Sequence, residues 1–154
     1  PAESMKVHHL YASKGKEPRA ALQVELEIEN DKRIHFISTH LDHSRGQNDR
    51  VAQTQNLNRI LSTIGQPILL AGDLNATPNS RPIKILTEKW NMTAGDHPNP
   101  TYPSIQPERK IDYIMYHPAD RWKVVNHKVI EGSKASDHCP FVVVIRLKAS
   151  SCME

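Results

Sequence analysis

The sequence predicts an α+β fold in which a mixed, mostly antiparallel sheet of about six strands carries helices on one face. Three patterns support this prediction. Apolar and polar residues alternate over residues 22–29, which is typical of a strand with one solvent-facing side. Apolar residues at helical spacing between residues 57 and 64 indicate an amphipathic helix. A continuously apolar run over residues 67–71 indicates a central strand covered on both faces.

The N-terminal part is expected to hold an irregular segment followed by a hairpin. Residues 1–18 are polar and contain a glycine and a proline as breaks, so they are expected to be irregular. The alternating strand that follows turns at Asn30-Asp31-Lys32. Residues 33–39 then return as a second strand, which makes a hairpin the simplest interpretation.

A strand-helix-strand unit occupies the middle of the chain. After a polar loop, a helix is expected to begin near residue 48 and to end at Gly65, because glycine favours helix termination. The apolar strand over residues 67–71 follows it. A second, short helix is expected over residues 80–89, with a proline tolerated in its first turn.

The C-terminal part is expected to add strands and one long loop. Residues 91–109 contain several prolines and no periodicity, which predicts a surface loop of the kind that often carries function. The domain is expected to span residues 19–148 and to end in a disordered tail over residues 149–154. Three more strands are predicted, over residues 111–116, 123–131 and 141–147.

The late strands are apolar enough to require cover on both faces of the sheet. Residues 141–145 are apolar throughout, and apolar residues occupy both sides of the strand over residues 111–116. Two helices can cover only one face, and an uncovered apolar face acts as an association surface. We therefore expect a further layer, supplied by a missing N-terminal half or by a dimer partner.

Composition narrows the class of protein. The 154 residues are 38% apolar, which supports one domain with a real core. A net charge of +3 is compatible with an anionic substrate, nucleic acid included, although the basic residues are not clustered. No run approaches the roughly 18 apolar residues that a membrane span needs. The two cysteines, Cys139 and Cys152, match neither a disulfide framework nor a zinc site.

Asp73 and Asn75 follow the central strand and form the first candidate site. Because side chains alternate along an extended chain, residues two apart point the same way, so the carboxylate and the amide are expected to project together. The carboxylate can orient or deprotonate a water, and the amide can donate to a phosphoryl oxygen. Glycine, aspartate and asparagine are also ordinary turn residues, so this segment alone fits a turn equally well.

Imidazole and further carboxylate groups occur in Asp137-His138, Asp112 and His40. His138 can act as a base, an acid or a phosphate donor near neutral pH. Asp112 lies in an apolar strand where an unpaired carboxylate would be costly, so it is a plausible orienter of His138, although a lysine or a backbone amide could also pair with it. His40 ends a strand and can donate to a phosphate oxygen, but a single histidine there is more often structural.

Four polar segments at strand ends carry a resemblance to a known family. Together, and in this order, they resemble the endonuclease/exonuclease/phosphatase superfamily, which has the deoxyribonuclease-I-like fold. The resemblance extends over about residues 18–147. The segments are Ser38-Thr39-His40-Leu41-Asp42, the run from Ala71 to Pro78, Lys110-Ile111-Asp112-Tyr113-Ile114, and the run from Ala135 to Pro140.

The resemblance implies a role for each matching residue. Asp73 would orient or activate the attacking water, and Asn75 would contact the nucleophile and the phosphate. His138 would contact the scissile phosphate, and Asp112 would hold the His138 ring. His40 would bind a phosphate oxygen.

The resemblance also implies a metal site and a missing part. Asp137 would assist the metal, and Mg²⁺ or Mn²⁺ is expected because the available ligands are hard oxygens. Members of the family are similar to a four-layer α/β/β/α sandwich built from two halves, of which this chain resembles only the C-terminal half. A metal-binding glutamate and an acidic partner for the residue matching His40 would lie in the other half, so the isolated chain can be inactive alone.

These observations favour a metal-dependent phosphoester hydrolase, either a phosphodiesterase or nuclease or a phosphatase, present here as a fragment. The alternative is a noncatalytic binding or assembly module that pairs through its exposed sheet face. A magnesium-dependent assay with a generic phosphodiester, combined with light scattering, distinguishes the two hypotheses. A specific nucleic-acid binder is the least favoured class, because the net charge of +3 is small.

Overall fold

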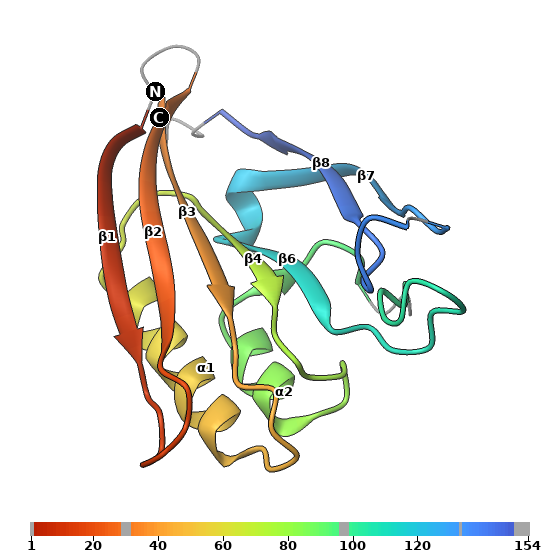
Figure 1. Ribbon diagram of the computed structural model, residues 1–154. Helices are drawn as coiled ribbons and strands as arrows, with labels where there is room; N and C mark the ends of the chain where they lie inside the picture. Colours follow the sequence, from red (N-terminus) through yellow and green to blue (C-terminus); the bar gives the residue numbers. More distant parts are fainter. Residues whose placement is uncertain (1, 29–31, 96–98, 133, 150–154) are drawn as a thin grey trace.

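The computed structural model describes residues 2–28, 32–95, 99–132 and 134–149. The described residues form a six-stranded sheet in the order β1-β2-β3-β4-β6-β5, most of which Figure 1 labels. Only β3 and β4 pair in parallel within it, so the sheet is mixed and mostly antiparallel, and the predicted α+β class is confirmed. Its strands are β1 (Ala2–Leu10), β2 (Arg19–Ile28), β3 (Lys32–His40), β4 (Ile68–Asp73), β5 (Asn91–Met92) and β6 (Asp112–His117).

Strand β1 shows that the expectation of an irregular segment over residues 1–18 was wrong for residues 2–10, whereas residues 11–18 contain no helix or strand. Residues 2–10 pair antiparallel with β2 at the edge of the sheet. Most side chains of β1 are exposed, and Leu10 at its end is the one that is buried in the main core. Because neither face of the strand is consistently buried, its sequence lacks the alternation that identifies a half-buried strand.

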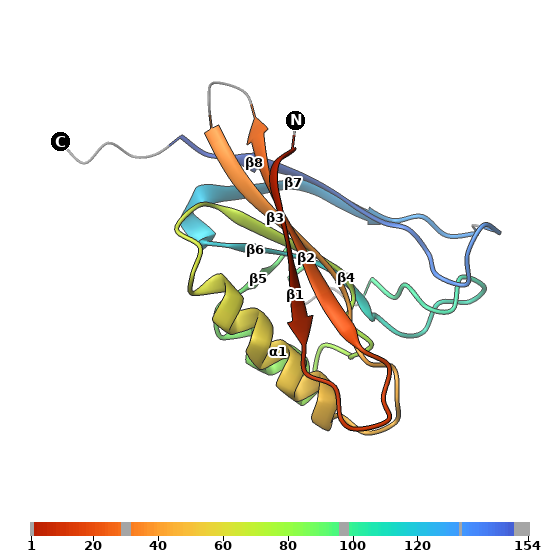
Figure 2. The same ribbon diagram turned by 60° about the vertical axis from the view of Figure 1, so that its left-hand side comes forward.

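The predicted hairpin and helices are present. Strand β2 pairs antiparallel with β3, while residues 30 and 31 of the expected turn lie outside the described residues. Helix α1 (Asn48–Leu61) brings the chain back so that β4 runs parallel to β3. Helix α2 (Arg81–Thr87) follows β4, and both helices cover one face of the sheet, as expected (Figure 2). Neither of these described helices is long and apolar enough to cross a membrane.

The main core lies between the helices and the sheet. Leu57 of α1 and Leu86 of α2 are fully buried against side chains such as Ile37, Leu70 and Met115 from the three central strands. At about 25 cal/mol per Å² of apolar area, burial of such side chains is the main force that holds an amphipathic helix on a sheet. This core therefore holds β3, β4 and β6 side by side, and the candidate residues lie where these strands meet.

Strands β7 (Trp122–Val129) and β8 (Phe141–Leu147) form a separate two-stranded antiparallel sheet. The sequence patterns placed both of them in the main sheet, and the structure corrects this. A short 3₁₀ helix over Ala119–Arg121 separates β6 from β7. Trp122 then packs on Ile34 and Leu69, on the sheet face opposite the helices. An alternating pattern identifies a strand but not its partner, so the second sheet was not predictable.

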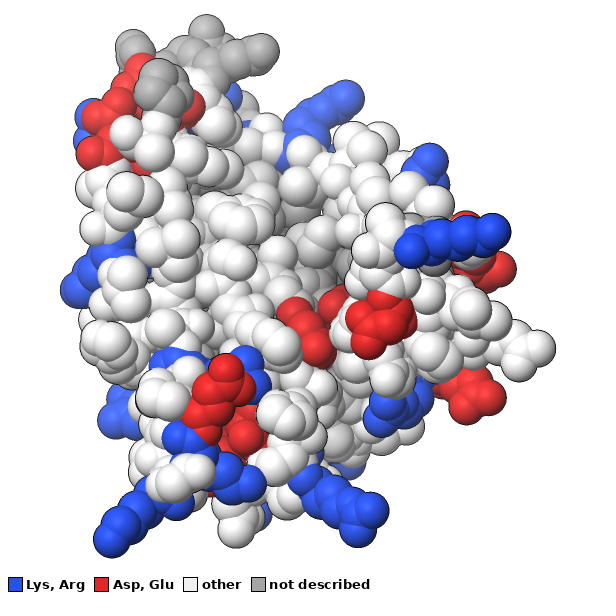
Figure 3. Space-filling model, in the orientation of Figure 1, with Lys and Arg blue, Asp and Glu red and all other residues white. Residues whose placement is uncertain are grey.

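The sheet face opposite the helices is covered only in part by β7 and β8. On the strands β1 and β2, the side chains of Met5, Val7 and Leu22 are 74%, 57% and 39% exposed. Figure 3, which views this face, shows a surface with few charged side chains over the central strands and charged groups around its rim. The further layer that would cover this face stays a prediction.

Candidate active site

Three strands bring His40, Asp73 and Asp112 together. His40, the last residue of β3, stands opposite Asp73, the last residue of β4, and Asp73 stands opposite Asp112, the first residue of β6. Residues directly opposite one another in a sheet point to the same face. Asp73 and Asp112 therefore both point to the face that the helices leave free, where they line one cavity of about 320 Å³.

His138 reaches this cavity from the loop before β8. Its Nδ1 lies 2.8 Å from Oδ2 of Asp112, so the nitrogen donates to the carboxylate. This hydrogen bond fixes the tautomer of the ring and leaves Nε2 for a second function. The expected contact between Asp112 and His138 is thus present, whereas the catalytic role of each residue stays a prediction.

The expectation for Asp73 and Asn75 needs correction. Strand β4 ends at Asp73, and Asn75 has a positive φ of 48°, so the two residues do not belong to one extended segment. Oδ1 of Asp73 accepts a hydrogen bond of 2.8 Å from the backbone N of Asn75, which is the pattern of an Asx turn. The Asn75 side chain is anchored separately, because its Nδ2 donates to the carbonyl oxygen of Leu41 at 3.1 Å.

His40 contacts the cluster of Asp73, Asp112 and His138, whereas Asp137 lines a different cavity. Nε2 of His40 lies 3.4 Å from Oδ2 of Asp73. Asp137 is exposed and lines a neighbouring cavity of about 750 Å³. The described side chains that could together hold a metal ion do not include it; they are Asp73, Asp112 and His138, whose ligand atoms lie within 4.8 Å of one another. Two carboxylates at this spacing are suitable donors for a hard divalent cation.

Burial and charge change the acidity of the cluster. Burial raises the pKa of Asp73, and the nearby charge of Asp112 adds to this, against a backbone hydrogen bond from Asn75 that lowers it. Burial lowers the pKa of His138, but the hydrogen bond and the charge of Asp112 outweigh it, so the net shift is upward. An imidazole with a raised pKa holds its proton more readily beside an anionic ligand.

We expect Asp73→Asn to stabilise the metal-free protein. A raised pKa means that the ionised carboxylate is less favourable in the folded than in the unfolded state. The ionised Asp73 therefore lowers the free energy of unfolding at a pH above its folded-state pKa. Well below pH 3.8, the ordinary pKa of the group, the carboxyl is protonated in both states and this cost is absent. The variant should therefore gain about 0.5–2 kcal/mol in the free energy of unfolding at neutral pH and nothing at about pH 3. Urea denaturation with a chelator present measures both values.

Asp42→Asn is the matched control for this experiment. Burial raises the pKa of Asp42, but hydrogen bonds from Ser44 and the charges of Lys16 and Arg50 outweigh it and lower the pKa overall. The ionised form of Asp42 therefore favours the folded state, and its neutral replacement should lose stability at neutral pH. If Asp73→Asn destabilised the protein as Asp42→Asn does, the electrostatic description of the cluster would be wrong.

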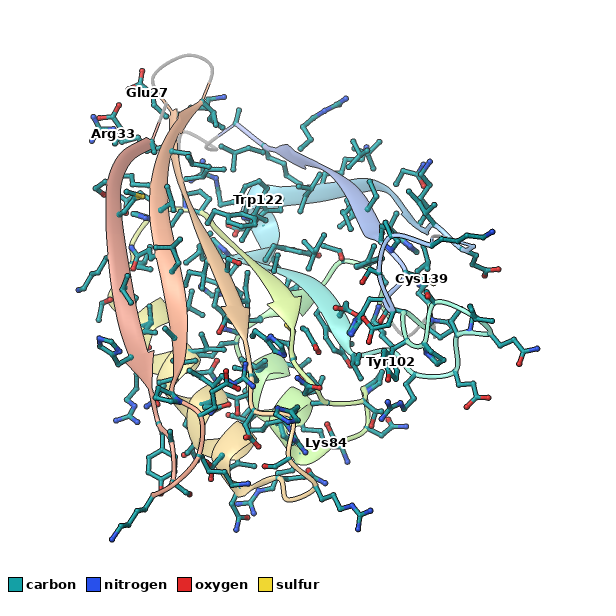
Figure 4. All side chains as sticks on the ribbon, in the orientation of Figure 1. Glu27, Arg33, Lys84, Tyr102, Trp122 and Cys139 are labelled. Atoms are coloured by element: carbon teal, nitrogen blue, oxygen red, sulfur yellow. The ribbon has the colours of Figure 1, made fainter. Side chains whose placement is uncertain are left out.

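Tyr102 lies beside His138 and Arg109 lies against Tyr102; neither was singled out from the sequence. The Tyr102 and His138 rings have centroids 4.9 Å apart, and the guanidinium carbon of Arg109 lies 4.7 Å from the centre of the Tyr102 ring. Figure 4 shows Tyr102 and Cys139 on two neighbouring loops at this edge of the sheet. The prediction of a functional loop over residues 91–109 was the only available signal, since an isolated tyrosine in a loop has no diagnostic spacing.

Solved structures of similar fold support this architecture. A mannosyl-6-phosphatase from Bacteroides thetaiotaomicron is 18% identical, with a TM-score of 0.80 over 96% of this chain and 67% of that one. The human nocturnin catalytic domain with bound sulfate is 23% identical, with a TM-score of 0.72 over 94% and 60%. Truncated TDP2 from Caenorhabditis elegans is 18% identical, with a TM-score of 0.65 over 91% and 64%. These identities establish the fold alone, and the chain spans about two thirds of the length of those structures or less.

Comparison of the sequence with protein families identifies the family. The sequence matches no curated protein. The model of the Endonuclease/Exonuclease/phosphatase family, however, matches residues 1–138, which are most of the chain. The match includes all four strand-end segments up to His138. Three of these segments supply residues that line the cavity between β4, β6 and the loop before β8. The chain therefore belongs to the endonuclease/exonuclease/phosphatase family.

Proposed function

We propose that this chain carries the catalytic residues of a divalent-metal-dependent phosphoester hydrolase. The observation that supports the proposal most strongly is the convergence of His40, Asp73, Asp112 and His138 from separate segments on one small area. Structural carboxylates and imidazoles are usually spread over a surface. Here two carboxylates and an imidazole share one open cavity, and their ligand atoms lie within 4.8 Å of one another, close enough to act on one substrate group.

The proposed chemistry is an in-line attack of water on phosphorus. The bond from the water oxygen to phosphorus forms while the bond from phosphorus to the ester oxygen breaks, and the leaving group departs as an alcohol that takes its proton from solvent. Asp73 orients the water and accepts its proton, a role for which a carboxylate that lines the cavity is suited. His138, held by Asp112, directs Nε2 at a phosphoryl oxygen and donates a hydrogen bond to the charge that develops there. His40 contributes a second donor at the end of β3.

The donor set fits Mg²⁺ or Mn²⁺, which Asp73 and Asp112 would hold through oxygen. A bound cation of this kind would neutralise negative charge on the phosphoryl oxygens. Asp137 would assist the metal from the adjoining cavity. The two cavities are neighbours, because Ser136 lines both of them. The substrate we propose is a phosphomonoester or a phosphodiester, nucleic acids included.

Removal of divalent metal is expected to abolish hydrolysis by the full-length protein. With Mg²⁺, release of p-nitrophenolate from p-nitrophenyl phosphate or from its diester should exceed the uncatalysed rate. A chelator should lower that release about 100-fold or more, because several kcal/mol of charge stabilisation are lost. Added Mg²⁺ or Mn²⁺ should restore it. Hydrolysis that persists in the chelator would contradict the metal requirement, and absence of hydrolysis of both esters would contradict the proposed function.

The exposed apolar face is the one observation that favours a second function, a binding or assembly module. We propose instead that a further layer covers this face in the full-length protein and completes a four-layer sandwich, because Met5, Val7 and Leu22 would otherwise form an exposed apolar surface. Light scattering alongside the hydrolysis assay decides between the two. A stable oligomer without metal-dependent turnover would favour the module.

A further inference from the structure

Thr101 is completely buried beside the start of β6. Its Oγ1 accepts hydrogen bonds from the backbone N–H groups of Ile111 and Asp112, each at 3.3 Å. A side-chain oxygen thus serves as acceptor for two N–H groups at the point where β6 begins. Buried N–H groups need such acceptors, so the position of the Asp112 backbone depends on this hydroxyl.

The same residue also contacts the segment that carries His138. The carbonyl oxygen of Thr101 accepts a hydrogen bond of 2.7 Å from the backbone N of Cys139, the residue after His138. On the other side of His138, the carbonyl oxygen of Asp137 accepts a 2.7 Å hydrogen bond from the backbone N of Ser104. The segment from Thr101 to Ser104 therefore holds the chain on both sides of His138.

We infer that Thr101 is a positioning residue that sets the distance between Asp112 and His138. The inference rests on the proposed function, in which these two side chains act as a pair. Asp112 and His138 are far apart in the sequence, and the 2.8 Å contact between them requires both backbones to be fixed relative to each other. Thr101 bonds to one backbone through its hydroxyl and to the other through its carbonyl, and a displacement of less than about 1 Å is enough to weaken such a contact.

Three variants separate this role from ordinary burial. Thr101→Val removes the hydroxyl and keeps the shape, and Thr101→Ser keeps the hydroxyl. Thr93→Val is the matched control, since Thr93 is also a buried threonine whose Oγ1 bonds to β6, donating to the carbonyl oxygen of Ile114 at 2.7 Å. Thr101→Val and Thr93→Val each remove one buried hydroxyl next to the same strand, but only Thr101 contacts Asp112.

The first measurement is the NMR signal of the His138 Nδ1 proton, which reports the bond to Asp112 directly. We expect this signal in the wild type, in Thr101→Ser and in Thr93→Val, and we expect it to be lost or shifted in Thr101→Val. The second measurement is phosphoester hydrolysis by the full-length protein. In Thr101→Val, kcat should fall about 10–100-fold with KM changed less than about threefold, and serine should restore kcat to within about threefold.

Two results would overturn the inference: an unchanged Nδ1 signal in Thr101→Val, or a kcat in that variant equal to that of Thr93→Val. If Thr101→Val does not fold, Thr101→Ala takes its place and the same two quantities decide. If the wild type hydrolyses no phosphoester, the proposed function fails, while the Nδ1 signal still decides whether Thr101 positions the pair.

Discussion

Gly72→Ala is expected to destabilise the protein by more than about 4 kcal/mol or to prevent folding. A Cβ atom at this position would overlap the carbonyl oxygen of Thr39 on the neighbouring strand and would lie 2.9 Å from the carbonyl carbon of that residue. Both neighbours are backbone atoms in a central pair of strands and cannot move aside. Gly72 also has a φ of 153°, a backbone angle that residues other than glycine rarely adopt.

The same substitution would disturb the site. Gly72 stands opposite Thr39 in the register that also places Asp73 opposite His40, so separating β3 from β4 at Gly72 separates this pair as well. Urea denaturation measures the loss of stability, with Gly65→Ala as the control. No atom lies within 4 Å of a Cβ built at Gly65, so that variant should stay within about 1 kcal/mol of the wild type. Equal stabilities of the two variants would contradict the close approach at Gly72.

His138→Gln should lower kcat/KM of the full-length protein about 10²–10³-fold, because a neutral amide stabilises the charge that develops on the phosphoryl oxygen less than an imidazole held by the Asp112 carboxylate. Asp112→Asn should have an effect of the same order, since it removes the charged acceptor that fixes the His138 tautomer. The two residues act as a unit, so the double variant should lose little more than His138→Gln alone. Steady-state hydrolysis of a p-nitrophenyl ester measures all three.

His117→Gln is the matched control for these variants. His117 is the last residue of β6, at the opposite end from Asp112, and its Nδ1 contacts the carbonyl oxygen of Lys89. The rate of this variant should stay within about threefold of the wild type. Effects of Asp112→Asn and His138→Gln that multiply in the double variant would show that the two residues act independently, contrary to the proposed pairing.

Local patterns predicted those elements whose apolar residues follow a clear pattern. Helix α1 was visible because its apolar residues recur at helical spacing, β2 because apolar and polar residues alternate along it, and β4 because it is apolar on both sides. Strand β1 was missed because its exposure is nearly uniform, and a uniform strand has no periodic signal.

The site was predictable in its residue types more than in its geometry. The need of a carboxylate in an apolar strand for a partner left His138, a lysine or a backbone amide as candidates for Asp112, and the family resemblance implied the contact with His138 that is present. The register that places Asp73 between His40 and Asp112 depends on contacts between distant segments, which no local pattern encodes. Alternation was the wrong argument for Asn75, because the strand ends two residues earlier.

A crystal structure of the full-length protein with phosphate and Mg²⁺ tests most directly whether these strand ends form one phosphate site. We predict a phosphate ion in the cavity between Asp73 and His138, with Nε2 of His138 within about 2.7–3.2 Å of one of its oxygens. A phosphate ion bound elsewhere, with the Asp73 and His138 side chains pointing away from it, would contradict the account.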